Sequence, residues 1–308
     1  MNKKFIFTNL LGSFILNSKY MVIDKGNDEN KLTSRYKNLF KPEGNELKDI
    51  LNYFKKKQFF NEFYNKNIQL TKKQVKDSVN EDNFIINTIN NIEELNKVTN
   101  TLVRRLREWY GLYLPEFTKE LTDNEKFVEL IQRKSKKQLL SEINVKLGDS
   151  MGAEFSNADL KPIMNLATEI TKLYNLKESH ELYLDRIMTR ICPNMIAITG
   201  GLIGAKLVEH ARSIKHLSEL PASIVQLLGA EKALFRHLKS GAKSPKYGVI
   251  FDHPLISKAK RSDKGKVARA LADKIAIAIK VDYFKGKFVG DTLRKGLEKR
   301  FDDSKSKR

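Results

Sequence analysis

The chain has 308 residues, 41% of them hydrophobic, which is enough for two or three folded domains. Its net charge of +20 predicts a polyanionic partner, either nucleic acid or an anionic membrane surface. No run of 18 apolar residues exists, which argues against a transmembrane helix, and a single cysteine, Cys192, excludes an intramolecular disulfide or a cysteine-based zinc site.

Residues 1–83 are predicted to form a small α/β domain. The short apolar runs KFIF, SFIL and YMVI are separated by turn-forming residues and indicate a β-meander. Polar residues and Gly12 interrupt the first two runs, so this stretch is expected to belong to the fold and not to a secretory signal. After the loop KPEG, a helix is predicted in which Leu47, Ile50, Leu51 and Phe54 share one face.

Residues 84–196 are predicted to form a long coiled-coil hairpin that self-associates. Heptad positions 85, 89, 92, 96, 99, 103, 106 and 110 hold six apolar residues, with Asn96 and Thr99 as exceptions. A second register takes positions 163, 167, 170, 174, 177, 181, 184, 188, 191 and 195. An ordinary helical bundle would show the same periodicity, so this alternative stays open.

Local signals predict where these helices begin and end. Gly111 and Pro115 are expected to end the first long helix, and Gly148 and Gly152 to end a later one. The segment SNAD has the spacing of a capping box, with aspartate in place of the usual glutamate, and predicts the start of the second long helix.

Residues 197–302 are predicted to form an all-α domain, followed by a basic tail at 303–308 that is expected to be disordered. Four helical elements are expected, in the segments MIAITGGLIGAKLVEHA, LSELPASIVQLLGAEKALFRHL, KGKVARALADKIAIAIKVDYF and DTLRKGLEKRFDD. The segment PKYGVIF is expected to be extended.

No motif in the chain predicts catalysis, a cofactor or a metal. The glycines of TGGLIGAK match neither dinucleotide-binding nor P-loop spacing, so close helix packing is the better explanation. No two of the five histidines are four residues apart, as two metal ligands on one helix face would be. The chain is therefore predicted not to be an enzyme.

Basic residues are concentrated in the last third of the chain. Residues 190–308 carry +15 of the +20 net charge. Lys232, Arg236 and Lys239 recur at helical spacing and predict a cationic helix face, which Lys243 and Lys246 extend. More cations follow at Lys258, Lys260, Arg261, Lys264, Lys266 and Arg269.

Glycines and aromatic residues accompany these cations. Gly229, Gly241, Gly248 and Gly265 would let a partner approach the backbone closely. His237, Tyr247 and Phe251 are of the type that stacks on unpaired bases, although Phe251 is expected to pack in the core. These aromatic residues favour RNA as the polyanion, and an anionic membrane surface stays open as the alternative.

The segment PASIVQLLGAEKALFRHLKSGAKSPKYGVIFDHPLI resembles the signature of the Nop domain, and the likeness continues to KGLEKRF. Upstream, LVRRLREWYGLYLPEF and DSMGAEFSNADL resemble the coiled-coil segment of the same family. The resemblance covers roughly residues 95–302 and is strongest to the archaeal members of box C/D ribonucleoproteins. The N-terminal residues resemble the family least.

The resemblance implies a non-catalytic scaffold for 2′-O-ribose methylation of rRNA or tRNA. In such an assembly the N-terminal domain would bind fibrillarin, the S-adenosylmethionine-dependent methyltransferase, and the coiled coil would self-associate. The Nop domain would bind a box C/D guide RNA together with a small ribosomal-type kink-turn-binding protein. No membrane partner is expected, and the location implied is the cytoplasm of an archaeon, or the nucleolus if the source is eukaryotic.

Carried over residue by residue, the family's binding motif falls on Gly229, Ala230, Glu231, Lys232, Ala233, Leu234, Phe235 and Arg236. The predicted RNA and partner surface also includes His237, Lys239, Lys243, Lys246, Arg261, Lys264, Lys266 and Arg269. The apolar ALF within the motif would serve helix packing, a protein contact, or both.

Alternatives from other classes remain at this point. One is a spliceosomal-type Nop-domain protein, and another is a general basic RNA-binding or chaperone protein. An anionic-membrane binder would need one basic amphipathic helix with large exposed apolar residues, whereas the charge here spans several elements.

Overall fold

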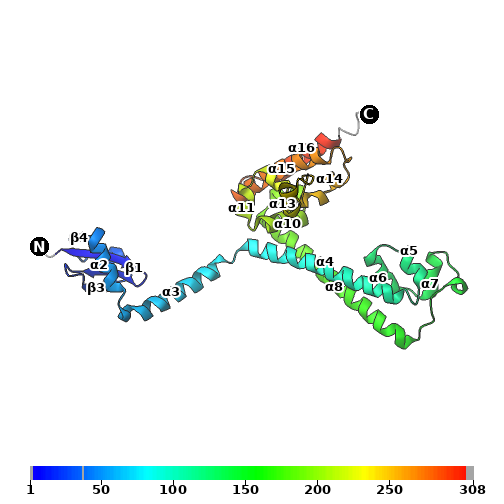
Figure 1. Ribbon diagram of the computed structural model, residues 1–308, viewed down its shortest axis with the longest axis horizontal. Coiled ribbons are helices and arrows are strands. Elements are labelled where there is room, and N and C mark those ends of the chain that lie inside the picture. Colours follow the sequence, from blue (N-terminus) through cyan, green and yellow to red (C-terminus); the bar gives the residue numbers. More distant parts are fainter. Residues whose placement is uncertain (1–2, 37, 303–308) are drawn as a thin grey trace. The chain divides into compact units, whose positions relative to one another are not determined.

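The computed structural model describes residues 3–36 and 38–302. They form two compact units, and the chain passes from the first to the second between Asn80 and Glu81 (Figure 1). As predicted, the chain is mainly helical, and its described strands form one small sheet in the first unit. Among the described residues no helix is both long and apolar enough to cross a membrane. The predicted basic tail lies outside the described residues.

The first unit is built on a sheet of order β3-β2-β1-β4. The predicted meander is confirmed by three antiparallel strands, β1 (Lys4–Asn9), β2 (Gly12–Leu16) and β3 (Val22–Gly26). Two short elements escaped prediction, α1 (Glu29–Thr33) and β4 (Leu39–Phe40), which pairs in parallel with β1.

Two helices follow the sheet. Helix α2 (Gly44–Phe54) buries Ile50 and Phe54 against the sheet, but Leu51 is exposed, so the predicted four-residue face was wrong at that position. Helix α3 (Lys57–Ser78) buries none of its residues.

The second unit begins with two long paired helices, α4 (Glu81–Tyr110) and α8 (Asn157–Ile191). Seven of the eight predicted α4 seam positions are buried, including Thr99, whose hydroxyl donates to the Leu95 carbonyl at 2.8 Å. The eighth was wrong, since Leu95 is buried in place of Asn96. In α8, Ile163, Ala167 and Ile170 are buried as predicted, and the register positions Tyr174, Lys177 and Glu181 are half-buried.

Three short helices and a 3₁₀ turn cover the far end of this pair (Figure 1). They are α5 (Pro115–Glu120), α6 (Asn124–Arg133), α7 (Lys136–Glu142) and η1 (Leu147–Asp149). Arg107 stabilises the turn between α5 and α6, because its guanidinium donates to the carbonyls of residues 118, 121 and 123, and its Cζ lies 4.3 Å from the centroid of the Phe127 ring.

The boundaries at this end are partly as predicted. Helix α4 ends before Gly111, and the capping box of Ser156 and Asp159 opens α8. The predicted helix end at Gly148 and Gly152 was wrong, because α7 stops at Glu142. Gly152 has another role: a Cβ there would lie 2.0 Å from the Tyr113 carbonyl oxygen.

The rest of the second unit is all helical, with more breaks than the four predicted elements. Gly200, at φ +72°, separates α9 (Pro193–Thr199) from α10 (Gly201–Ala211). The next predicted element divides into α11 (Ile214–Glu219), α12 (Ala222–Val225) and α13 (Glu231–Ser240). Part of PKYGVIF was wrongly expected to be extended, because Val249–Asp252 forms the 3₁₀ turn η2 before α14 (Pro254–Ser257).

Helix α15 (Lys264–Tyr283) is the centre of this core and α16 (Gly290–Asp302) follows it. Leu271, Ile275 and Ile279 are fully buried between α15 and the surrounding helices. At its end, the Asp282 carboxylate accepts from the backbone N–H groups of Asn194 (3.0 Å) and Met195 (2.9 Å). The α15 end is thereby tied to the start of α9.

Candidate nucleic-acid interface

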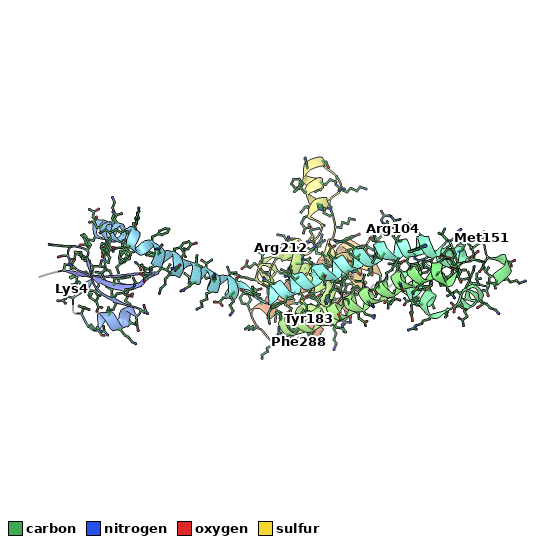
Figure 2. All side chains as sticks on the ribbon, turned by 90° about the horizontal axis from the view of Figure 1, so that it is seen from below. Lys4, Arg104, Met151, Tyr183, Arg212 and Phe288 are labelled. Carbon is green, nitrogen blue, oxygen red and sulfur yellow. The ribbon has the colours of Figure 1, made fainter. Side chains whose placement is uncertain are left out.

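Helix α13, the yellow helix that projects from its unit in Figure 2, carries the centre of the predicted site. It buries none of its residues. Lys232, Arg236 and Lys239 are exposed, and none of them takes part in an ion pair within residues 3–36 and 38–302. Three cations on one helix face therefore remain available to an external anion.

An apolar face adjoins the cationic one. Phe235 is 66% exposed and Leu238 is 75% exposed, one helical turn apart. Of the two roles expected for the ALF segment, helix packing is wrong for Phe235, because its ring contacts no core. Large apolar side chains held in water on an otherwise solvated helix are typical of a docking surface.

The base of α13 is fixed by glycines that the chain uses for its own packing. Gly229 lies at φ +85°, and a Cβ there would come within 2.5 Å of the Val249 side chain. A Cβ on Gly248 would lie 1.8 Å from the Leu228 carbonyl oxygen. The backbone of Val249 donates to that carbonyl at 2.7 Å and so joins the two segments. These two glycines thus serve an internal contact, and the approach of a partner to their backbone stays a prediction.

Glu231 is the acidic residue of the motif, and it acts within the chain. Its carboxylate accepts from the Gly229 N–H at 2.7 Å and lies 3.6 Å from the His210 ring. Burial opposes its ionisation, but these backbone N–H groups and His210 together lower its pKa. Glu231 therefore stays charged in the first turn of α13, where a negative charge is favourable, next to the cations that would bind phosphate.

The loop after α13 leads to a second group of predicted residues. Tyr247 stacks on Phe251 with ring centroids 4.8 Å apart, and the Lys264 ammonium lies 4.8 Å from the Phe251 centroid. The Lys246 side chain lies at ordinary contact distance, 4.0 Å, from the position of a Cβ on Gly265. The structure thus brings the 243–251 loop together with the start of α15.

Phe251 and His237 are aromatic-ring residues of this region whose surroundings bear on the predicted stacking. Phe251 was wrongly expected in the core, since it is 39% exposed. His237 contacts the Ala242 carbonyl through Nδ1 and ties the loop back onto α13, so its stacking on a base stays a prediction.

The remaining predicted cations are at the surface. Arg261, Lys266 and Arg269 are exposed, and Lys264 is half-buried. Lys266 lies 3.5 Å from Asp263 in an exposed pair, which is worth little in water and leaves the cation accessible. No described ion pair involves Arg261 or Arg269. Their contact with RNA remains a prediction.

The glycine-rich TGGLIGAK segment lies elsewhere, where it lines a cavity of about 420 Å³ beside α4 and α8 and packs closely at two of its glycines. A Cβ on Gly201 would lie 1.7 Å from an Asp185 carboxylate oxygen, and one on Gly204 would lie 3.0 Å from the Met188 methyl carbon. The prediction of close helix packing at these glycines is confirmed.

Comparison with known proteins now identifies this arrangement. The family model Nop, described as "snoRNA binding domain, fibrillarin", matches residues 91–303. The chain belongs to the Nop family. This confirms the resemblance that the GAEKALFR segment carried, and the matched region contains α13, α8 and all of α4 from residue 91 onward.

Relatives come from archaea and eukaryotes. The chain is 39% identical over 287 residues to an uncharacterised NOP5 family protein of Methanocaldococcus jannaschii, covering 88% of this chain and 68% of that protein. It is 36% identical over 250 residues to nucleolar protein 56 of Schizosaccharomyces pombe, covering 74% of this chain and 50% of the relative.

The match to nucleolar protein 58 of Coccidioides immitis is 40% over 215 residues, covering 65% of this chain and 35% of the relative. The chain thus spans half or less of these nucleolar relatives. A chain in a crystal structure of a fibrillarin/Nop5p complex aligns over 97% of this chain and 99% of its own length, with 22% identity and a TM-score of 0.47.

Proposed function

We propose that this Nop family protein is a non-catalytic scaffold of a box C/D-type guide ribonucleoprotein. It bridges a guide RNA, a kink-turn-binding protein and fibrillarin for 2′-O-ribose methylation. Family membership and the basic surface of the second unit support this proposal.

The observation that supports the proposal best is the exposure of helix α13 to solvent. Its cationic face and its apolar face are both open to solvent on a helix that contributes nothing to the core. A helix that only stabilised the fold would bury Phe235, and a helix that only bound phosphate would not need Phe235 or Leu238. Two neighbouring faces of different chemistry fit two partners held side by side, RNA and the kink-turn-binding protein.

The first unit would bind fibrillarin. Met21 and Ile23 on and beside β3, and Phe40 in β4, are exposed apolar side chains of the sheet edges. Exposed apolar edge residues are typical of a protein contact. The family description and the relatives support this partner, although sequence likeness to the family was weakest in this unit.

Self-association needs a surface other than the predicted registers. The α4 and α8 seams bury their apolar residues against each other within one chain. At the far end of the pair, Leu112, Leu147 and Met151 remain exposed. We propose this end as the self-association surface.

The experiment on α13 separates its two faces. Arg236→Glu is expected to weaken binding of a kink-turn guide RNA strongly, because repulsion replaces a possible bidentate phosphate contact. Arg236→Ala should reduce the slope of log affinity against log salt by roughly 0.7 to 0.9 for one lost phosphate contact. The paired substitution Phe235→Ala and Leu238→Ala should instead weaken recruitment of the kink-turn-binding protein and leave that slope unchanged.

The controls decide between this function and its rivals. If Arg236→Glu kept full RNA affinity and an unchanged slope, α13 would not be the RNA site. Equal affinity for kink-turn and unstructured RNA in the presence of the kink-turn-binding protein would favour a general RNA chaperone. Methyl transfer by the highly purified chain with S-adenosylmethionine would refute the scaffold role.

A further inference from the structure

The loop between α15 and α16, residues 284–289, presents two aromatic rings to solvent. Phe284 is 76% exposed and Phe288 is 56% exposed. Tyr283 lies edge-on to Phe284, with centroids 5.1 Å apart and an interplanar angle of 75°. In the view of Figure 2, Phe288 lies on the side of the unit away from the projecting helix α13.

Both ends of this loop are fastened by hydrogen bonds. At its start the Gly286 N–H donates to the Val281 carbonyl at 2.8 Å and the Lys285 N–H donates to the Asp282 carbonyl at 3.1 Å. This is the Schellman pattern that ends a helix, with Lys285 in the left-handed region at φ +53° where glycine is usual.

At the other end, the Asn194 side-chain oxygen accepts from the N–H groups of Val289 (2.5 Å) and Gly290 (2.8 Å). Asn194 is itself 1% exposed. A loop fixed at both ends holds its exposed rings in place, so a partner that stacks on them loses little additional conformational entropy in the protein.

The charge around the rings decides which partner fits. Lys280, Lys285 and Lys287 are exposed and take part in none of the ion pairs of the described chain. Two acidic residues are close in the sequence. Asp282 is buried, and its carboxylate accepts a hydrogen bond from the backbone at the start of α9; Asp291 lies in the first turn of α16. Alternating aromatic and cationic side chains are the pattern by which proteins bind single-stranded nucleic acid, because bases stack on rings while lysines meet phosphates.

We propose that residues 283–288 form a second RNA contact, at which an unpaired base stacks on Phe284 or Phe288 and Lys285 and Lys287 contact adjacent phosphates. The choice of RNA as the polyanion rests on the proposed function. The contact differs from the α13 surface in needing no partner protein and no kink-turn, since stacking on a ring is tolerant of sequence and of fold.

The test uses the full chain and a short fluorescein-labelled oligouridine, with fluorescence anisotropy at several salt concentrations. Phe284→Ala and Phe288→Ala are each made. At least one of them should weaken binding about tenfold, within the range measured for a lost base–ring stack. The matching tyrosine variant should keep most of the affinity. Leu182→Ala, which removes a 61% exposed side chain from α8, is the matched control and should bind as the parent does.

The lysines give an independent readout. Lys287→Ala should reduce the salt slope by about 0.7, the value for one phosphate of a single strand, whereas the phenylalanine variants should leave the slope unchanged. Lys285→Gly removes a cation at a backbone position that glycine occupies without strain, so a loss of affinity there is not a folding defect.

Parent-like oligouridine affinity in both phenylalanine variants would overturn the proposal. Parent-like RNA affinity combined with lost binding of fibrillarin or of the kink-turn-binding protein would assign the loop to a protein contact, and would overturn it equally. The proposed function fails separately, through parent-like kink-turn RNA binding by Arg236→Glu, so the two failures are distinguishable.

Discussion

Replacing Asn194 by alanine is expected to open the core around Cys192 while the chain stays folded. The Asn194 side chain joins three elements, because its amide nitrogen donates to Asp282 at the end of α15 and its oxygen accepts from the backbone before and at the start of α16. Asn194 itself lies in the first turn of α9.

The magnitude follows from the bonds that are lost. Alanine removes the 2.7 Å bond to the Asp282 carboxylate and leaves the N–H groups of Val289 and Gly290 without their acceptor. A buried donor left unpaired costs about 1 to 3 kcal/mol, and the backbone bond from residue 194 to Asp282 is kept. The expected loss of local stability is therefore roughly 3 kcal/mol.

The chain provides its own probe, since Cys192 is its single cysteine and is fully buried. Burial raises the pKa of this thiol, so it reacts with a thiol reagent only when the structure around it opens. A loss of roughly 3 kcal/mol should accelerate labelling by about 100-fold, at 1.4 kcal/mol for each factor of ten.

Asn175→Ala removes an exposed amide from α8 and serves as the control, for which labelling should stay at the parental rate. An unchanged rate in Asn194→Ala would refute the reasoning, because it would mean that the three hydrogen bonds do not limit opening. Circular dichroism on both variants verifies that helix content is retained.

Three further outcomes are expected. Burial lowers the pKa of His253, whose ring accepts a hydrogen bond from the Leu255 N–H at 3.2 Å. Below about pH 6.5 the unfolded chain therefore binds a proton on this histidine that the folded chain does not bind. The unfolding free energy should therefore fall as pH drops, and His253→Gln should flatten that part of a urea-measured profile. Arg107→Lys should cost about 2 kcal/mol in urea unfolding, since lysine cannot reach three carbonyls from one plane. Gly201→Ala should destabilise by its clash with Asp185, and a double-mutant cycle with Asp185→Ala should recover most of the loss.

Periodicity predicted the long paired helices but not every detail of their seam. The heptad template assigned Asn96, but the neighbouring Leu95 is buried instead, because an apolar side chain gains from burial in the seam whereas the Asn96 amide would need a hydrogen-bond partner there. The glycines near 150 were read as a helix end because glycine is common there. The true constraint at Gly152 is a close approach to Tyr113 from a different segment, which no local pattern contains, whereas a Cβ on Gly148 would meet nothing within 4 Å.

The site was predictable where its chemistry is local. The spacing of Lys232, Arg236 and Lys239 sufficed for a cationic face. Whether Phe235 and Phe251 face the core or water depends on which tertiary surface is nearby, and an apolar residue at helical spacing is the same signal in both cases. The exposed loop after α15 was missed for this reason, although the alternation of lysine and phenylalanine in YFKGKF was a usable sign.

The paired helices α4 and α8 hold two separate hydrophobic cores, one at each end. Ile85, Ile89 and Ile92 belong to the first, and Val103 and Leu106 belong to the second. Between them α4 has Thr99, whose hydroxyl is turned back onto its own helix, and the predicted seam positions of α8 in this stretch, Tyr174, Lys177 and Glu181, are only half-buried. In this middle section the fewest apolar side chains are buried between the two helices. Bending of the helices and faster amide hydrogen exchange are therefore expected there. The hairpin is therefore expected to bend at this middle section, while the helices at each end stay held by their own hydrophobic core.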